Sequence, residues 1–372
     1  MKKVIYMMAA AAIALSSCSS EETTDVAKSS NITFRTTVGL NSRGLELTGN
    51  NMTKMTVSAF DGTNAYFANK VFEKGEGNIF ECKAFNPTWP KDGTLTFVAY
   101  SHLGEAWGYT PTLTSTGATI TGFAPESNIK DQHDVVFAYG TGSRADNETN
   151  GVELNFEHIL SQIKIKVKNT DTDLHYSIKG IRIASVSGSA NYEFAHGADK
   201  NSHTWTISGT ANAVYETEFE NPISLENSDP VDLTDKCNAG GGAGGAMIIP
   251  QTPTVWNGTD RAADFENFKG KAYISLLINV KRGNTNIYPA SGTGYCWAAV
   301  ALPSGTKWEA GNKYIYTLDL TNGCGKIDPV DPGVDPGVNP GDQIFGKEIK
   351  FTVNVLGWTD AFADTNNGQI KM

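Results

Sequence analysis

The chain has 372 residues, with 30 basic and 40 acidic side chains and a formal net charge of −10. This length predicts two or three domains. Hydrophobic residues make up 40% of the chain, which is enough for packed cores and too much for a disordered protein. The acidic balance argues against nucleic acid as a partner, because phosphate binding needs a clustered basic surface. The 38 glycines and the Thr/Asn-rich composition favour a turn-rich β protein.

The first residues predict the compartment. Lys2 and Lys3 precede an apolar run over residues 4–15, which is too short to span a bilayer comfortably and is typical of a signal peptide. The run ends in Leu-Ser-Ser-Cys, the pattern of a bacterial lipobox, so we predict a lipoprotein signal peptide over residues 1–17 and lipidation of Cys18. An ordinary signal peptide with a chance cysteine is the alternative. Acyl chains such as palmitate would anchor the protein with ~0.8 kcal/mol per buried CH₂.

A flexible polar tether is predicted over residues 18–30, and short alternating runs bounded by turn residues follow it. Strands are predicted at residues 32–38, 52–60, 95–100, 135–139, 162–168, 178–186, 246–249, 272–280, 297–302, 314–320 and 349–358. Residues 162–168 alternate aliphatic side chains with lysine, which predicts a half-buried antiparallel strand. Because amphipathic helical windows are scarce, the fold class is all-β, with β-sandwiches at 31–148 and 149–326 separated at a turn-rich boundary.

A Pro/Gly/Asp-rich linker over residues 327–343 precedes the C-terminal strand segment, 344–372. Proline removes backbone donors, so the linker is expected to be extended or broken by turns. Its aspartates, Asp328, Asp331, Asp335 and Asp342, lack the spacing of a calcium loop and indicate a solvated acidic linker. After the linker, four apolar side chains share one face of the last strand: Ile349, Phe351, Val353 and Val355.

Motifs that would indicate catalysis are missing from the sequence. There is no HExxH, no nucleophile elbow and no P-loop. His158 is interpreted as a structural histidine beside a core strand. The seven tryptophans could include a sugar-stacking platform, but core packing is the better interpretation. We predict no enzyme activity, no cofactor and no metal site.

Four cysteines follow Cys18, and their redox state stays open. None forms a CxxC pair or has zinc-finger spacing. Four thiols allow three disulfide pairings, and free buried thiols are an equal alternative. The residues are Cys82, Cys237, Cys296 and Cys324.

Several segments in order along the chain resemble the fimbrillin family, the subunits of type V pili in Bacteroides-group bacteria. The lipobox and the acidic residues after it resemble the surface-exported lipoproteins of that group. The family's other motifs are matched by residues 41–44, 154–165, 247–252 (MIIPQT), 302–316 (with W-x-x-G-x-x-Y-x-Y) and 349–358. Together these segments span nearly the whole mature chain.

The resemblance implies two transthyretin-like β-sandwich domains and assembly by strand exchange. A trypsin-like, arginine-specific protease would remove the first strand, and the C-terminal strand of another subunit would fill the groove. Arg43 lies in a polar turn, where proteases reach easily, and Arg35 inside the first strand is the alternative site. The displaced strand would present Ile32, Phe34, Thr36 and Val38, and the donor strand would present Ile349, Phe351, Val353 and Val355.

The expected function is that of a surface-exposed structural pilus (fimbria) subunit that supports adhesion. Its partners would be other pilus subunits, the protease, a host or bacterial receptor and, before maturation, the outer membrane through the lipid. One alternative is a membrane-retained anchor subunit that keeps its first strand. The other is a surface glycan-binding lipoprotein that neither is trimmed nor polymerises.

Overall fold

The computed structural model describes residues 30–38, 51–102, 107–197, 201–225, 229–237, 244–260, 270–331, 333, 339–347 and 349–358. Cys18 and Arg43 lie outside the described residues, as do the signal peptide and most of the predicted tether. The described residues are almost all strands and connecting turns, with one four-residue α-helix, α1 (Arg144–Asn147), among them. The all-β class predicted from the sequence is therefore confirmed.

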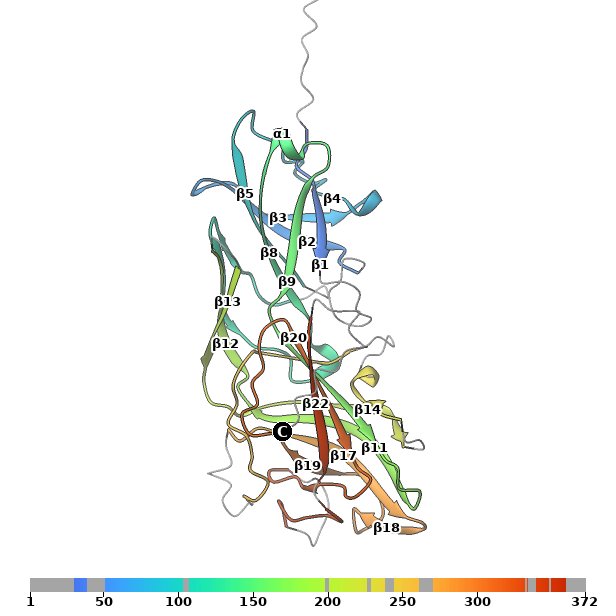
Figure 1. The fold of residues 1–372 in the computed structure, drawn as a ribbon. Coiled ribbons are helices and arrows are strands. Elements are labelled where there is room, and N and C mark those ends of the chain that lie inside the picture. Colours follow the sequence, from blue (N-terminus) through green and yellow to red (C-terminus); the bar gives the residue numbers. More distant parts are fainter. Residues whose placement is uncertain are drawn as a thin grey trace, which may run out of the picture.

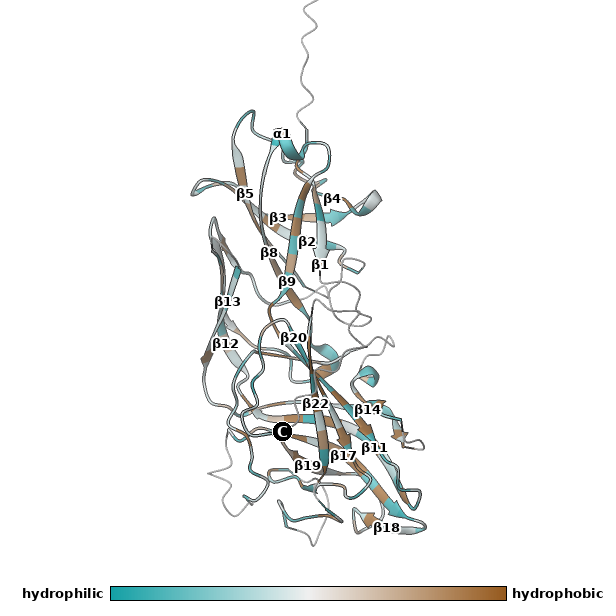
Figure 2. Cartoon of the chain, viewed as in Figure 1, coloured by the Kyte–Doolittle hydropathy of each residue, from teal (hydrophilic) through white to brown (hydrophobic). Residues whose placement is uncertain are grey.

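The upper part of the molecule in Figure 1 is a barrel with the strand order β1-β4-β3-β2-β5-β8-β9, in which β1 and β9 pair to complete the circle. Alternate side chains of these strands fill its interior, and Figure 2 shows the apolar segments along β2, β5 and β9. The strands are β1 (Phe34–Val38), β2 (Lys54–Asp61), β3 (Asn64–Lys74), β4 (Phe80–Glu81), β5 (Thr94–His102), β8 (Val135–Ser143) and β9 (Val152–His158).

The lower part contains two sheets that enclose the largest core. One has the order β15-β10-β20-β22, with β16 also on β10, and the other has the order β14-β11-β17-β19-β21, with β18 on β17. The strands are β10 (Ser161–Lys168), β11 (Leu174–Val186), β14 (Ala213–Ser224), β15 (Val231–Asp232), β16 (Ala246–Ile248), β17 (Tyr273–Arg282), β18 (Thr285–Tyr288), β19 (Cys296–Ala301), β20 (Asn312–Asp319), β21 (Lys326–Ile327) and β22 (Lys350–Gly357).

Strand β10 corrects one detail of the sequence analysis. Its aliphatic side chains are buried and its lysines are half-buried, as the alternation predicted. Its longest pairing, however, is parallel, with β20, while β15 and β16 pair with it antiparallel. Alternation reports one buried face of a strand and carries no information on the direction of its partners.

A further sheet, β13-β12-β7-β6, joins segments from both halves of the sequence. Its strands are β6 (Thr112–Thr114), β7 (Gly117–Phe123), β12 (Ser189–His196) and β13 (Asn201–Ser208). The hairpin β12–β13 thus pairs with residues on the other side of the turn-rich boundary, and β9, also beyond that boundary, pairs with β1 and β8. A separate aromatic core lies at this junction and includes Phe137, Tyr192 and Trp358.

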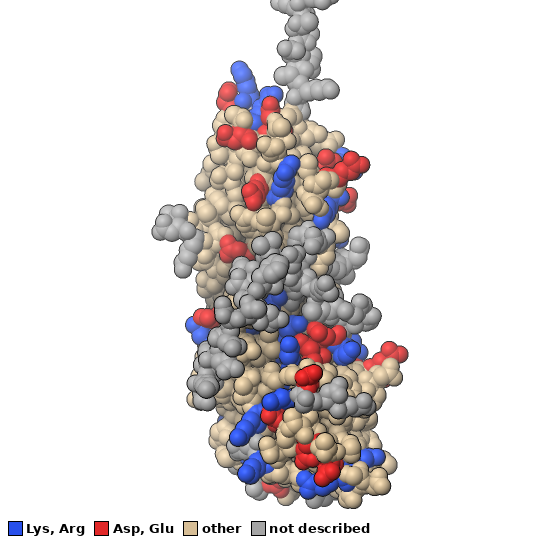
Figure 3. Space-filling model, turned by 45° about the vertical axis from the view of Figure 1, so that its right-hand side comes forward, with Lys and Arg blue, Asp and Glu red and all other residues tan. Residues whose placement is uncertain are grey.

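The charged side chains on the face in Figure 3 are of both signs and lie among uncharged residues. That face has no extended basic area. Among the described residues, no helix is long and apolar enough to cross a bilayer.

Candidate functional site at the first and last strands

The first strand buries an aromatic anchor in the barrel. The Phe34 side chain has no exposed surface, and its ring meets the rings of Phe72 and Phe97 edge-on at centroid distances of 4.8 and 5.0 Å. Ile32 and Val38 on the same face are also buried, and Thr36 between them is half-buried. Three of the four side chains predicted for the displaced strand therefore lie in the barrel core.

The backbone of β1 is held mainly by β9. The two strands run parallel over five residue pairs, from Phe34 opposite Val152 to Val38 opposite Phe156. The contact with β4 on the other side is a single pair, Phe34 opposite Phe80. Removing β1 would therefore leave an apolar groove between β4 and β9 and unpaired backbone groups along β9.

The last strand lies at the edge of its sheet. β22 pairs antiparallel with β20 over eight residue pairs, from Lys350 opposite Asp319 to Gly357 opposite Asn312. Among the described residues, no strand pairs with its other edge. Ile349 is 9% exposed, whereas Phe351, Val353 and Val355 are only half-buried against the core. This apolar face is therefore less well covered than that of β1.

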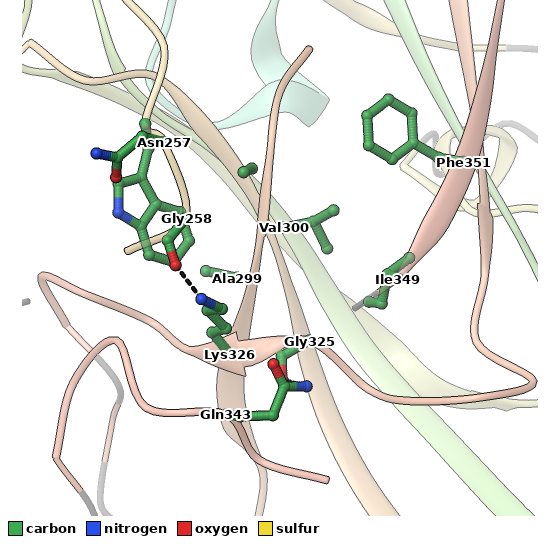
Figure 4. Close-up of a pocket in the computed structure, with 11 residues that line it drawn as sticks. Asn257, Gly258, Ala299, Val300, Gly325, Lys326, Gln343, Ile349 and Phe351 are labelled. Atoms are coloured by element: carbon green, nitrogen blue, oxygen red, sulfur yellow. Dashed lines mark hydrogen bonds between the residues drawn. The ribbon is translucent and has the colours of Figure 1, made fainter. Parts of the chain in front are cut away.

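A small cavity adjoins the first half of β22. Its volume is about 120 Å³, and it lies between Ile349 and Phe351 on one side and Ala299 and Val300 of β19 on the other. Figure 4 shows Lys326 at its margin, where the ammonium group donates a hydrogen bond to the Gly258 carbonyl. The first part of the last strand therefore borders a pocket that is partly open to solvent and does not pack fully against the opposite sheet.

The far end of β22 is anchored at the junction of the two halves. The backbone N–H of Trp358 donates to the Gly311 carbonyl at 2.7 Å, and its indole is 3% exposed. That indole lies against the imidazole of His158. Nδ1 of His158 lies 2.8 Å from Oδ2 of Asp134, and both side chains are almost fully buried. The prediction of a structural histidine is confirmed.

The start of the Asp-Pro-Gly linker contradicts the prediction of a solvated acidic segment. Asp328 is completely buried. The hydroxyls of Tyr273 and Ser275 donate to its carboxylate at 2.9 and 2.6 Å, and the guanidinium of Arg182 lies 3.5 Å from it. Arg182 also pairs with Asp331 at 3.2 Å. The linker is thus fixed to the lower sheets at its first residues by partners far away in sequence.

Nearby carboxylates stabilise the positive charge of Arg182. Burial alone would lower the pKa of this guanidinium, but the nearby carboxylates of Asp328, Glu216 and Asp331 raise the pKa overall. Its guanidinium carbon also lies 4.0 Å from the centre of the Trp297 ring. A buried carboxylate and a cation held in this way are costly to separate, because either one alone would be left uncompensated.

The comparison with protein families decides the identity of the chain. Residues 18–340 match the fimbrillin-like family. The chain belongs to this family. Its members are structural rather than enzymatic proteins, so the prediction of a non-catalytic fimbrial, cell-surface protein is confirmed. No curated protein matches the chain.

Solved structures similar to this fimbrillin-like protein include candidate cell adhesion proteins from Bacteroides uniformis and Bacteroides ovatus. Each is 14% identical, with 88% of this chain and 98% or 97% of the other chain covered and TM-scores of 0.47 and 0.46. The fimbrial anchor protein Mfa2 from Porphyromonas gingivalis is 11% identical over 88% of this chain and 97% of that chain, with a TM-score of 0.30. Because these scores lie below 0.5, the functional conclusion rests on the family match.

The tryptophans of this fimbrillin-like protein offer little for stacking on a sugar. Six of the seven indoles are at most 9% exposed: Trp89, Trp107, Trp256, Trp297, Trp308 and Trp358. The seventh, Trp205, is half-buried and donates its ring N–H to the Ile159 carbonyl at 2.9 Å. Core packing is therefore the role that these rings have, and none of the seven indoles supports the glycan-binding alternative.

The cysteines left open by the sequence are all buried in the structure: Cys82, Cys237, Cys296 and Cys324. Burial raises the pKa of Cys237 and of Cys324 to about 12. They act here as small apolar core residues rather than as nucleophiles. Within the described part of the chain, no group of three His, Cys, Asp or Glu side chains is placed to hold a metal ion.

Proposed function

We propose that this fimbrillin-like protein is a polymerising fimbrial subunit that is exported as a lipoprotein with acyl chains on Cys18. Trimming after Arg43 removes the lipid and β1, and β22 of another subunit then fills the groove. The observation that carries the proposal is the contrast between the two strands: β1 fills a groove that only its removal would open, and β22 is a half-covered edge strand on a linker. The polymer displays the subunit at the outer-membrane surface and supports adhesion to a host or bacterial receptor.

The energy available to such an exchange is considerable. Burial of four aliphatic or aromatic side chains contributes about 6–12 kcal/mol as an upper bound, before the entropy of ordering is subtracted. The hydrogen-bond ladder restored along β9 adds to this and covers an exposed sheet edge. Asp328 and Asp331 fix the start of the linker, so the segment that can extend is residues 332–348, which would reach ~50 Å at about 3.1 Å per residue.

The position of Arg35 within β1 favours Arg43 as the cleavage site. Arg35 lies in the middle of β1, opposite Glu153, where the backbone takes part in the ladder with β9. A protease hydrogen-bonds to the backbone of its substrate, and in β1 those backbone groups are already taken up by the neighbouring strand. Residue 43 falls in the polar run between β1 and β2. A subunit that is not cut keeps its lipid and acts as an anchor.

The proposal is tested by the N-terminus and the assembly state of the protein from native cells. N-terminal sequencing and intact mass should give a chain that begins at Gly44, and unboiled samples should form a ladder on SDS gels. An Arg43→Ala variant should keep lipidated Cys18 and form no ladder, while the control variant Arg35→Ala should behave like the wild type. A wild-type chain that keeps its lipid and runs as a monomer would contradict the proposal and indicate an anchor or a glycan-binding lipoprotein.

A further inference from the structure

The first and last strands share a residue pattern that goes beyond their common alternation. Residues 32–38 read ITFRTTV, and residues 349–355 read IKFTVNV. Isoleucine, phenylalanine and valine stand at the first, third and seventh positions of both segments. At the fifth position, Val353 of the last strand corresponds to Thr36 of the first. All four of these positions face the core in both strands.

From this match we propose that β22 of a second copy of the chain enters the β1 groove in the direction and register of β1, so that Phe351 occupies the socket of Phe34. The inference rests on the proposed strand exchange and adds the direction, the register and the anchor residue of the inserted strand. The inserted strand therefore runs parallel to β9 and antiparallel to β4, as β1 does.

Burial favours this placement of Phe351. In its own chain Phe351 is half-buried beside a cavity, and the ring of Tyr316 is 6.4 Å away. In the Phe34 socket a phenylalanine ring is fully buried and meets two rings at about 5 Å. Aromatic pairs at such distances contribute beyond the area that they bury. The exchange thus moves the same side chain to a better-packed site.

The fifth position favours exchange as well. Thr36 places a hydroxyl on the apolar face of β1, and Val353 places a methyl group there. Valine and threonine have nearly the same shape, but only threonine brings a polar group that loses water on burial. The other three inward side chains are unchanged, so the incoming strand matches the groove at least as well as the strand that it replaces.

The direction follows from where the two strands are attached. The start of β1 lies at the α1 end of the barrel, where Ser30 donates a hydrogen bond to Glu148. The donor arm is rooted at Asp328, which accepts a hydrogen bond from Ser275 of β17 and donates one to Trp297 of β19. Both strands lie in the lower part of Figure 1. When the lower end of one copy meets the α1 end of the next, the arm enters at the Ile32 side and runs as β1 does.

Insertion in the opposite direction is disfavoured by the same geometry. The arm would have to enter beside Val38, opposite Phe156 and close to the junction of the two halves. To reach that entry point from the α1 end, the arm would first have to run along the length of the barrel. The buried contacts of Asp328 fix the start of the arm, and residues 339–347 are hydrogen-bonded to residues 322–327 in the monomer. Once those later contacts are released, residues 332–348 would span about 50 Å at about 3.1 Å per residue. This length suits a direct end-to-end contact better than a path along a second subunit.

The register is tested with cysteine pairs in fimbriae purified from cells that produce only the variant. Arg35 lies opposite Glu153, and both side chains are exposed. In the proposed register Thr352 takes the place of Arg35. A chain with Thr352→Cys and Glu153→Cys should therefore give a covalent ladder in boiled, non-reduced samples, because neighbouring strands lie within disulfide range. Within one chain β22 pairs with β20, so this bond joins two copies.

The matched control pairs Thr352→Cys with Asn155→Cys, two residues further along the same face of β9. It should remain monomeric after boiling, as should the wild type with its buried thiols. A covalent ladder from the control pair alone, or from neither pair while the unboiled ladder persists, would overturn the register and leave strand exchange intact. Absence of the unboiled wild-type ladder would instead reject strand exchange itself, and the inferred register with it.

A peptide experiment guards against variants that fail to fold. A peptide of residues 347–358, added while trimmed wild-type chains assemble, should suppress the SDS-resistant ladder. The same peptide with Phe351→Ala should require at least a ten-fold higher concentration for equal suppression of the ladder. Thr352→Ala lies on the outward face and should leave the effective concentration of the peptide unchanged. Equal potency of all three peptides would contradict the assignment of Phe351 as the anchor.

Discussion

The indole of Trp358 stacks on the imidazole of His158, with ring centroids 4.2 Å apart and ring planes 5° apart. The contact joins the residue after the last strand to the end of β9, the strand that holds β1. The ammonium group of Lys313 lies over the same indole at 5.7 Å. In the monomer, Trp358 at the end of the proposed donor strand therefore contacts β9, the strand that borders the proposed acceptor groove.

We expect Trp358→Ala to loosen β22 without unfolding the barrel. The variant loses the stacked ring and its burial, and truncation of a buried tryptophan typically costs about 3–5 kcal/mol. Amide hydrogen exchange of residues 350–357 should become faster by at least ten-fold, while β5 and β8 should keep their protection. Trp358→Phe preserves an aromatic ring against His158 and should show a smaller effect. Unchanged exchange in β22 would mean that the stacking does not hold the strand.

Phe34 and Phe351 should differ in their effect on the stability of the uncut monomer. Phe34→Ala removes a fully buried ring from an aromatic socket and should lower the free energy of unfolding of the barrel by about 3–5 kcal/mol. Phe351→Ala removes a half-buried ring at an edge strand and should cost less than half as much. Urea unfolding followed by barrel and lower-sheet probes measures both. Equal losses would contradict the difference in packing on which the proposed exchange depends.

The anchor of the linker makes a separate prediction. Asp328→Asn removes the buried carboxylate that faces Arg182 and should destabilise the lower sheets by about 3–5 kcal/mol, because the cation loses its buried counter-charge. Asp331→Asn is the matched control. Its side chain is 63% exposed, so loss of this ion pair should cost at most about 1 kcal/mol. Thermal unfolding of the two variants measures both changes. Similar losses of stability would contradict a stabilising role for the buried ion pair between Asp328 and Arg182.

The two proposed exchange strands could be recognised from sequence because each has one buried face, which produces alternation at a period of two residues. The pairing of the hairpin β12–β13 with β7 could not be predicted, since β7 lies on the far side of the turn-rich boundary and long-range pairing leaves no local signal. The prediction that Asp328 is solvated is wrong for a related reason. The Pro/Gly/Asp composition of the segment suggests a linker, and the partners of Asp328, Arg182 and Tyr273, become its neighbours only in the folded chain.

A second link between the two halves depends on pH. Nε2 of His203, on β13, donates a hydrogen bond to the carboxylate of Glu157 on β9 at 2.8 Å. The hydroxyl of the buried Tyr192 lies 2.7 Å from Nδ1 of the same imidazole. The hydrogen bond from His203 lowers the pKa of Glu157 below its ordinary value of 4.5, against the opposing effect of burial, and Asn201 lowers it further.

The stabilising effect of this link should therefore disappear in acid. A carboxyl group with a lowered pKa in the folded state adds stability that is fully present above pH 4.5 and is lost as the pH falls through the lowered value. Glu157→Gln should be less stable than the wild type at pH 6, and this difference in stability should narrow as the pH falls below 4.5. Urea midpoints from pH 6 to pH 3 measure the gap, with Glu153→Gln on the outward face of β9 as the control for loss of one carboxylate. A gap for Glu157→Gln that stays constant down to pH 3 would show that the ionised form of Glu157 does not contribute to holding the hairpin on β9.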